Sequence, residues 1–163
     1  MIEYTKEELC NKIIQYSEFY RLNSDKTDLR KNKLKIKNFE EFIEKYILKE
    51  HKYKILSNEC LIELCLIEPE LLDYKIPIEV FEHLFDNYYD SKRKEDDKLN
   101  SYLISYCVTN NLNDKVDLFL KSSLRDRMEL ARCFNELFDI HKVKLLKDKS
   151  KKVLRMIDIT KNQ

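Results

Sequence analysis

The chain has 163 residues, enough for one domain with a buried core, and its 43% hydrophobic and 37% charged residues argue against general disorder. The formal net charge of +1 excludes a global electrostatic attraction to nucleic acid or anionic lipid. The chain contains no glycine, which excludes recognisable Walker A loops, dinucleotide-binding turns, nucleophile elbows and EF-hand loops. Long helices joined by Asn, Asp, Ser and Lys turns are expected instead, and the richness in Lys, Asn and Ile is typical of an AT-rich genome.

The first part of the chain predicts three helices. Thr5 and Glu8 form a capping box, followed by an apolar stripe at helical spacing. Residues 23–37 are polar and basic and predict a loop, after which Asn38 is expected to cap a second helix. Ser57 is expected to cap a third helix, which is apolar on several sides and therefore central. The residues expected in the core are Leu9, Ile13, Tyr16 and Tyr20, then Phe39, Phe42, Ile43, Tyr46 and Ile47, then Cys60, Leu61, Leu64 and Cys65.

The second part predicts four or five more helices. Pro69 should end the third helix, and Pro77 suits the first turn of the next. The run Asp90–Lys98 has no apolar residue and predicts a long turn. Ser123 is expected to cap a later helix, and the tail at 141–159 predicts one bent helix or two short ones. The residues expected to pack are Phe81, Leu84, Phe85 and Tyr88, then Leu99, Tyr102, Leu103, Tyr106 and Cys107, then Val116, Phe119 and Leu120, then Leu130, Phe134, Leu137 and Phe138.

Strand alternation is weak throughout, so the predicted fold class is all-α. We expect seven to eight helices packed as antiparallel hairpins, in either a bundle or a short irregular α-solenoid. Residues 1–163 are expected to form a single domain, with a possible internal break at 90–98. The start resembles no signal peptide, no apolar run is long enough to cross a bilayer, and the odd number of cysteines favours free thiols. We therefore expect an intracellular protein, cytoplasmic or nuclear, with no membrane partner.

The stretch 103–123, LISYCVTNNLNDKVDLFLKSS, predicts a helix, a polar turn and a second helix. The pairs that carry its pattern are Leu103-Ile104, Tyr106-Cys107 and Leu118-Phe119. It resembles the helical-hairpin unit of pentatricopeptide and tetratricopeptide repeats, a resemblance that implies stacked hairpins. Two positions depart from that unit: Asn110 replaces the usual turn glycine, and Lys115 replaces the small alanine where the two helices touch. An ordinary hairpin within a bundle therefore stays open.

No catalytic, cofactor-binding or metal-binding residue is predicted. The three histidines are far apart in sequence, and Cys60 and Cys65 point about 140° apart on a helix. His83 is expected on a solvated helix face.

Charge is distributed unevenly along the chain, with a basic segment at Lys26–Lys37, an acidic middle at Glu59–Asp97 and a basic tail. In a single tail helix, four cations would lie on one side at spacings of 3, 4 and 4, with Val143, Leu146, Val153 and Ile157 facing the core. These cations are Lys144, Lys147, Lys151 and Arg155. The stripe predicts contact with phosphates or with an acidic protein surface, and a solvated outer face is the alternative.

Three functional hypotheses follow from these patterns. The main one is a non-enzymatic helical protein–protein interaction module, a subunit or adaptor of a larger intracellular assembly, because 18 Phe and Tyr residues supply aromatic surface for a core and a docking face. The second is an RNA-binding helical-repeat protein that uses the basic stripe. The third is a compact viral helical bundle that captures a host helix in a groove, as Bcl-2-like viral proteins do.

Overall fold

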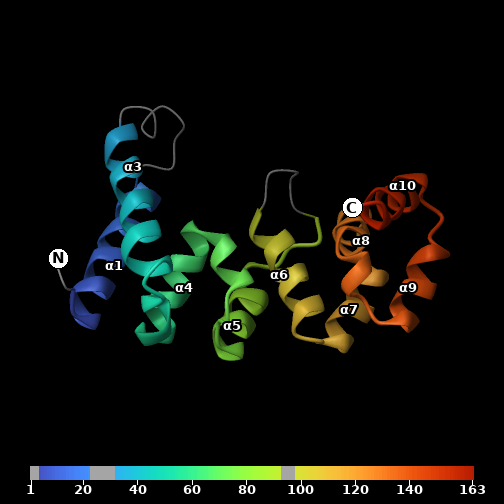
Figure 1. Ribbon diagram of the computed structural model, residues 1–163, viewed down its shortest axis with the longest axis horizontal. Helices are drawn as coiled ribbons and strands as arrows, with labels where there is room; N and C mark the ends of the chain where they lie inside the picture. The colour runs from blue at the N-terminus through green and yellow to red at the C-terminus, as the bar shows by residue number, and fades with distance from the viewer. Residues whose placement is uncertain (1–3, 23–31, 93–97) are drawn as a thin grey trace. The chain divides into compact units, whose positions relative to one another are not determined.

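The computed structural model describes residues 4–22, 32–92 and 98–163, and over these ranges the protein is all-α, as predicted (Figure 1). It is 78% helical, and the described ranges contain nine α-helices and no strand. Contacts divide the chain into two compact units: unit 1 comprises Met1–Leu71 and Ile76–His83, and unit 2 comprises Leu72–Lys75 and Leu84–Gln163. The single domain over 1–163 stays a prediction, and its possible break at 90–98 lies partly outside the described residues.

Unit 1 is built around α1 (Lys6–Leu22) packed on α4 (Asn58–Ile67). The predicted capping box starts α1: the Thr5 backbone N–H donates to Glu8 Oε2 at 2.8 Å, and the Glu8 N–H donates to Thr5 Oγ1 at 3.2 Å. The predicted Ser57 cap starts α4, where its hydroxyl accepts from the Cys60 N–H at 3.3 Å. Both helix starts follow from local sequence, since each cap satisfies an N–H that has no partner within its helix.

The next helix of unit 1, α3 (Lys33–Phe42), begins earlier than predicted. Asn38 is therefore not a cap but an exposed residue within the helix, and the loop prediction is wrong for residues 33–37. The residues Leu34-Lys35-Ile36-Lys37 are all well tolerated in a helix, so α3 extends toward the N-terminus from the predicted start. The remainder of the predicted loop, residues 23–31, lies outside the described residues. After α3 come a π-helical segment (Ile43–Leu48), a 3₁₀ turn (Lys52–Ile55), α4 and a 3₁₀ turn (Pro69–Asp73) that begins at the predicted breaker.

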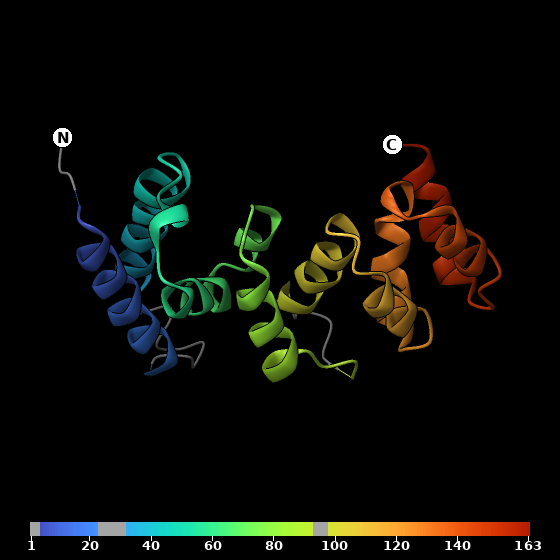
Figure 2. The same cartoon turned by 90° about the horizontal axis from the view of Figure 1, so that it is seen from below.

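Helix α5 (Ile78–Tyr88) is shared between the two units, and unit 2 continues with five further helices. These are α6 (Lys98–Thr109), α7 (Asn113–Leu120), α8 (Leu124–Arg132), α9 (Asp139–Leu146) and α10 (Lys151–Lys161). Helix α6 packs on α7 and α8, α7 packs on α8 and α9, and α10 packs on α8 and α9 (Figure 2). Contacts to the next helix and the next but one are typical of stacked hairpins, so within unit 2 they favour a short stack over a closed bundle.

The predicted helical hairpin at 103–123 is present as the end of α6, a turn and α7. The left-handed residue of the turn is Asn111, with φ 58°, and not Asn110. The Leu112 N–H donates to the Cys107 carbonyl at 2.8 Å, and the Asn111 N–H donates to the Val108 carbonyl at 3.1 Å. These two bonds form a Schellman motif, which normally uses glycine at the left-handed position. Asparagine tolerates that conformation better than most residues, so the turn closes in a chain without glycine.

Other predictions for unit 2 need correction. Ser123 caps α8 as predicted, accepting from the Asp126 N–H at 3.3 Å, but α8 ends at Arg132. Phe134 therefore lies in a short 3₁₀ turn, and Phe138 is 48% exposed instead of packed. The tail forms two helices, one of the two alternatives, and this raises the helix count above the seven or eight expected.

Several residues predicted for the core are in fact exposed. They are Tyr20, Tyr88, Phe138, Val143 and Leu146. None of the described helices has the length and apolar character needed to cross a membrane.

Candidate functional site

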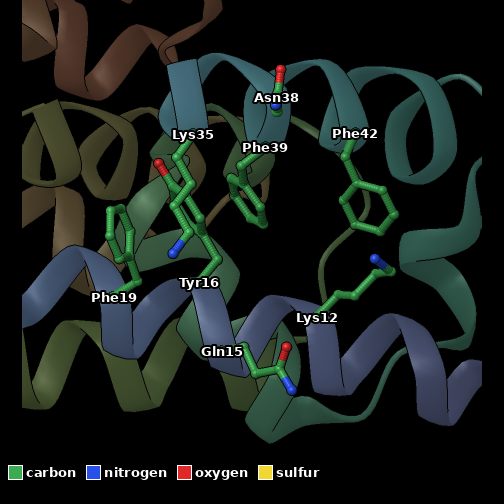
Figure 3. A pocket seen from close by; sticks show the side chains of 8 residues that line it. All are labelled: Lys12, Gln15, Tyr16, Phe19, Lys35, Asn38, Phe39 and Phe42. Carbon is green, nitrogen blue, oxygen red and sulfur yellow. The ribbon is translucent and has the colours of Figure 1, made fainter. Parts of the chain in front are cut away.

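A pocket of about 430 Å³ opens between α1 and α3 in unit 1 (Figure 3). The residues that line it are Lys12, Gln15, Tyr16, Phe19, Lys35, Asn38, Phe39 and Phe42. Figure 3 shows the rings and the two lysines in the space between the helices, whereas Asn38 points away from it. The lining combines four aromatic rings with two cations and contains no carboxylate.

Each helix contributes the same pattern to this pocket, a lysine followed by two aromatic residues at i+4 and i+7. On α1 the pattern is Lys12, Tyr16 and Phe19, and on α3 it is Lys35, Phe39 and Phe42. At 3.6 residues per turn these spacings place all three side chains on one face of each helix. The face of α1 and the face of α3 that line the pocket therefore carry the same arrangement of one lysine and two aromatic rings.

The rings and lysines of the two helices pair across the pocket in a reciprocal way. Tyr16 and Phe39 stack at the middle, with centroids 3.4 Å apart and planes 3° apart. Lys35 Nζ lies 4.2 Å from the Phe19 centroid, and Lys12 Nζ lies 5.5 Å from the Phe42 centroid. Each lysine thus lies over the last ring of the opposite helix, an arrangement with local two-fold character. The attraction between an ammonium and a ring face fixes the position of both lysines.

Burial raises the pKa of the Tyr16 phenol to about 12, with a further contribution from the negative charge of Glu40. Tyr16 therefore stays neutral at physiological pH, and its ring acts as an apolar wall. The charges that face the pocket are those of Lys12 and Lys35, so an occupant would need an apolar body and an acidic group.

The sequence carries a signal for this pocket that helical periodicity alone does not reveal. Residues 12–19 read KIIQYSEF and residues 35–42 read KIKNFEEF. The two segments share Lys, Ile, Glu and Phe at equivalent positions, and they pair Gln with Asn and Tyr with Phe. The repeat is only eight residues long, and three residues of the second copy, 35–37, fall in the segment predicted to be a loop. Aligning the chain against itself at short windows would have revealed it.

A second groove of unit 1, about 330 Å³, lies between α1 and α4 and includes His83 in its lining. Two of its charged groups are engaged with each other: Ser17 Oγ donates to Glu63 Oε2 at 2.5 Å, and the Arg21 guanidinium pairs with the same oxygen. Burial raises the pKa of Glu63, but the hydrogen bonds from Ser17 and Arg21 outweigh it and hold that pKa below its usual value. The lining also includes the carboxylates of Glu18 and Glu59, so this groove is acidic where the α1–α3 pocket is basic.

The four predicted basic residues do not form one helical stripe. Lys144 lies on α9 and Lys147 follows its end, whereas Lys151 and Arg155 lie on α10. All four side chains are exposed, but Lys144 Nζ pairs with Asp117 Oδ1 on α7 at 2.6 Å. Their role in binding phosphates or a partner stays a prediction.

The turn between α9 and α10 breaks the stripe because Asp148 is held in place. Arg127 Nε on α8 donates to Asp148 Oδ2 at 2.6 Å, and the Ser150 N–H donates to Asp148 Oδ1 at 2.8 Å. The spacing of 3, 4 and 4 assumed one continuous helix, and the pattern of charges alone could not reveal this long-range contact.

The cysteines and histidines are not gathered into a reactive cluster. All five cysteines are free, and burial raises the pKa of the Cys65 and Cys107 thiols to about 12. His83 is exposed, as predicted, and His141 is buried with Nε2 3.7 Å from Asp117 Oδ1. Within residues 4–22, 32–92 and 98–163, no group of three His, Cys, Asp or Glu side chains is placed to hold a metal ion.

No family model, curated protein or solved structure matches this chain. The resemblance of residues 103–123 to a pentatricopeptide or tetratricopeptide unit therefore rests on those residues alone. Lys115, the departure that argued against a tight helix crossing, extends instead over the ring of Phe85, with Nζ 4.0 Å from the centroid. The ammonium of this half-buried lysine is therefore placed over a ring face of α5.

Proposed function

We propose that this chain is a non-enzymatic helical protein–protein interaction module, a subunit or adaptor of a larger intracellular assembly, whose α1–α3 pocket receives an acidic, apolar segment of a protein partner. The observation that carries the proposal is the reciprocal pair of Lys-aromatic-aromatic faces around the 430 Å³ pocket. Aromatic walls that receive an apolar anchor are typical of the energetic centre of protein interfaces.

Charge supports a partner with carboxylates beside its anchor. Lys12 and Lys35 line the pocket and none of its lining residues is acidic. An Asp or Glu next to the inserted side chain would find an ammonium at either end. Complementary charge of this kind contributes mainly to the rate and specificity of association.

The ring geometry favours a protein anchor over nucleobases. Recognition of single-stranded RNA uses aromatic faces on which bases stack. Here Tyr16 and Phe39 stack on each other, and the lysines lie over Phe19 and Phe42. A base would have to displace these contacts, whereas an aliphatic or aromatic side chain can pack against ring edges and lysine stems.

The test is native size-exclusion chromatography of the tagged chain from its natural source. We expect it to elute in a complex well above its own 19.9 kDa, stable to ribonuclease and to about 300 mM salt. The double variant Phe42→Ser, Lys35→Glu should lose the complex. The matched control is Lys33→Glu, which makes the same charge change on α3 outside the pocket lining.

Two outcomes would contradict this proposal. Elution of the wild-type chain as a free monomer would remove the assembly role. Loss of the complex on ribonuclease treatment would point to the RNA-binding alternative.

A further inference from the structure

Helix α9 turns apolar side chains outward, in addition to those it buries. Its inner face consists of His141, 3% exposed, and Leu145, 1% exposed. On the other side Ile140 is 63% exposed, Val143 is 50% exposed and Leu146 is 45% exposed. Three such residues within one eight-residue helix form a contiguous apolar face, which on a folded protein usually marks a contact site.

The position of α9 within unit 2 explains what kind of surface this is. Each of the helices α6 to α10 packs on two or three others of the stack. Helix α9 has α7 and α10 packed against it, and Figure 1 places it at the end of unit 2 away from α6. Its outward face is therefore where one more helix of such a stack would lie. End helices of stacks normally turn a polar face outward, and α9 does not.

Charge around this face selects the occupant. Helix α9 and the turn that follows it, residues 139–149, carry four Lys against two Asp. Lys147 lies one turn beyond Val143 and shares its side of the helix. Two copies of this surface would repel each other, and a helix bordered by Asp and Glu would be attracted to it.

A membrane surface fits this face less well than a protein helix does. Asp139 lies beside Val143 on the outward side, and its side chain is fully exposed. Insertion of the apolar face into lipid would bury that carboxylate, and an eight-residue helix offers little apolar area to offset the cost.

We infer that the outward face of α9, formed by Ile140, Val143 and Leu146, is a docking site for an amphipathic helix of a protein partner whose apolar stripe is bordered by carboxylates. The partner helix would extend the stack of unit 2 by one layer. This site is separate from the α1–α3 pocket, so the chain would contact its assembly at two independent surfaces.

The test measures binding of a designed probe by fluorescence anisotropy. The probe is a labelled 20-residue helical peptide with Leu at i, i+3 and i+7 spacing and Glu on both flanks. The assay uses the full chain carrying Phe42→Ser and Lys35→Glu, so that the pocket contributes nothing and failure of either proposal is recognised separately. We expect saturable micromolar binding that weakens about tenfold for Ile140→Ser, Val143→Ser, since the loss of two anchors costs at least that factor.

Matched controls separate the face from general surface effects. Ile55→Ser removes an isoleucine that is 48% exposed in unit 1 and should leave binding unchanged. Lys147→Glu should weaken binding about threefold, whereas Lys92→Glu, an exposed lysine before α6, should not. A probe with Lys in place of Glu should bind at least tenfold more weakly.

Three results would overturn the inference. One is no saturable binding of the Glu-flanked probe up to about 100 µM. Another is a dimer, detected by light scattering, that the double variant Ile140→Ser, Val143→Ser converts to a monomer. The face would then be an interface between two copies of this chain. The last is binding to phosphatidylcholine–phosphatidylserine vesicles that the same variant abolishes. The face would then be a membrane-binding surface.

Discussion

Units 1 and 2 hold their helices together with different chemistry. In unit 1 a chain of rings joins α1 to α3, with the Tyr16–Phe39 stack at its centre. The buried polar residues of the described chain lie mostly in unit 2: Asn100, Asp126, His141 and Thr160, against Ser17 in unit 1. Apolar packing tolerates changes of shape, whereas buried polar groups require specific partners. The comparison indicates that the stability of unit 1 depends mainly on how well apolar side chains fill its core. The stability of unit 2 depends also on hydrogen bonds between buried polar groups.

Asp126 is the centre of the polar network in unit 2. Its carboxylate is fully buried and accepts from Tyr89 Oη at 2.5 Å and from Ser122 Oγ at 2.7 Å. The adjacent Arg127 donates to the Ser122 carbonyl and to Asp148, both at 2.6 Å. This network joins the end of α5, the α7–α8 turn and the α9–α10 turn, and it fixes the positions of turns that have no glycine.

The largest expected effect is the loss of the ring stack in unit 1. Phe39→Ala removes an 8% exposed ring and should lower the free energy of unfolding by about 3 to 5 kcal/mol. The control is Phe138→Ala in unit 2, where the ring is 48% exposed and the same change should cost less than about 1 kcal/mol. Urea denaturation followed by circular dichroism measures both, and hydrogen exchange should locate the loss in α1 and α3. Equal costs for the two variants would mean that the Tyr16–Phe39 stack contributes no more to stability than an exposed ring does.

A slightly smaller effect is expected from Asp126→Ala in unit 2. The change leaves the Tyr89 and Ser122 hydroxyls without their acceptor and should cost about 2 to 3 kcal/mol. Asp114→Ala, an exposed acid on α7, should stay within about 0.5 kcal/mol of the wild type. Hydrogen exchange should show faster exchange in α7 and α8 while α1 and α4 are unchanged. Faster exchange throughout both units would mean that they unfold together.

The sequence predicts only part of this difference between the two units, because local features can be predicted and long-range contacts cannot. The caps at Thr5, Ser57 and Ser123 were predicted correctly because each depends on residues within one turn. The core of α4 was predicted because an almost wholly apolar helix has to be buried. Burial of Asp126 was not predicted, since an acidic residue after a serine cap normally reads as an exposed helix start.

The candidate site was harder to predict than the fold. Phe39 and Tyr16 were both assigned to the core, but their pairing joins residues 23 positions apart across an antiparallel contact. Burial of Val143 is predicted only if the tail is a single helix that packs one face on the core. In the stack of unit 2, Leu145 and His141 supply the buried face of α9 and Val143 lies outside.

A third effect, smaller at accessible pH, is loss of stability in alkali. The pKa of Tyr16 is raised to about 12 from 10.0, and those of Cys65 and Cys107 to about 12 from 9.0, all mainly by burial. The unfolded chain therefore loses these protons at lower pH than the folded chain, so the free energy of unfolding should fall as pH rises from about 9 to 12. Urea midpoints measured under reducing conditions at pH 8 and 10.5 test this. Cys65→Val, a change in unit 1, should make the free energy of unfolding fall less steeply with pH. If the fall with pH is unchanged, the buried Cys65 thiol does not contribute to it.

The smallest effect concerns two left-handed positions among the described residues, one in each unit, that would ordinarily use glycine. Asn111 in unit 2 has φ 58° and His51 in unit 1 has φ 53°. Asn111→Ala should destabilise by about 1 kcal/mol, because a Cβ without a polar group is disfavoured at positive φ. Asn111→Gly should be neutral or slightly stabilising, whereas His51→Gly also loses the ring contact with Tyr53 at 5.9 Å and should gain less.

Asn110 provides the control, because it occupies the position of the glycine in the repeat unit that residues 103–123 resemble, yet its backbone is not left-handed. Its amide donates to the Tyr106 carbonyl at 2.9 Å, so Asn110→Gly should cost about 0.5 to 1 kcal/mol. Thermal unfolding of the four variants gives the order of their stabilities directly. A gain for Asn110→Gly with a loss for Asn111→Gly would place the left-handed residue where the repeat pattern puts it, and the Schellman turn at Asn111 would then be wrong.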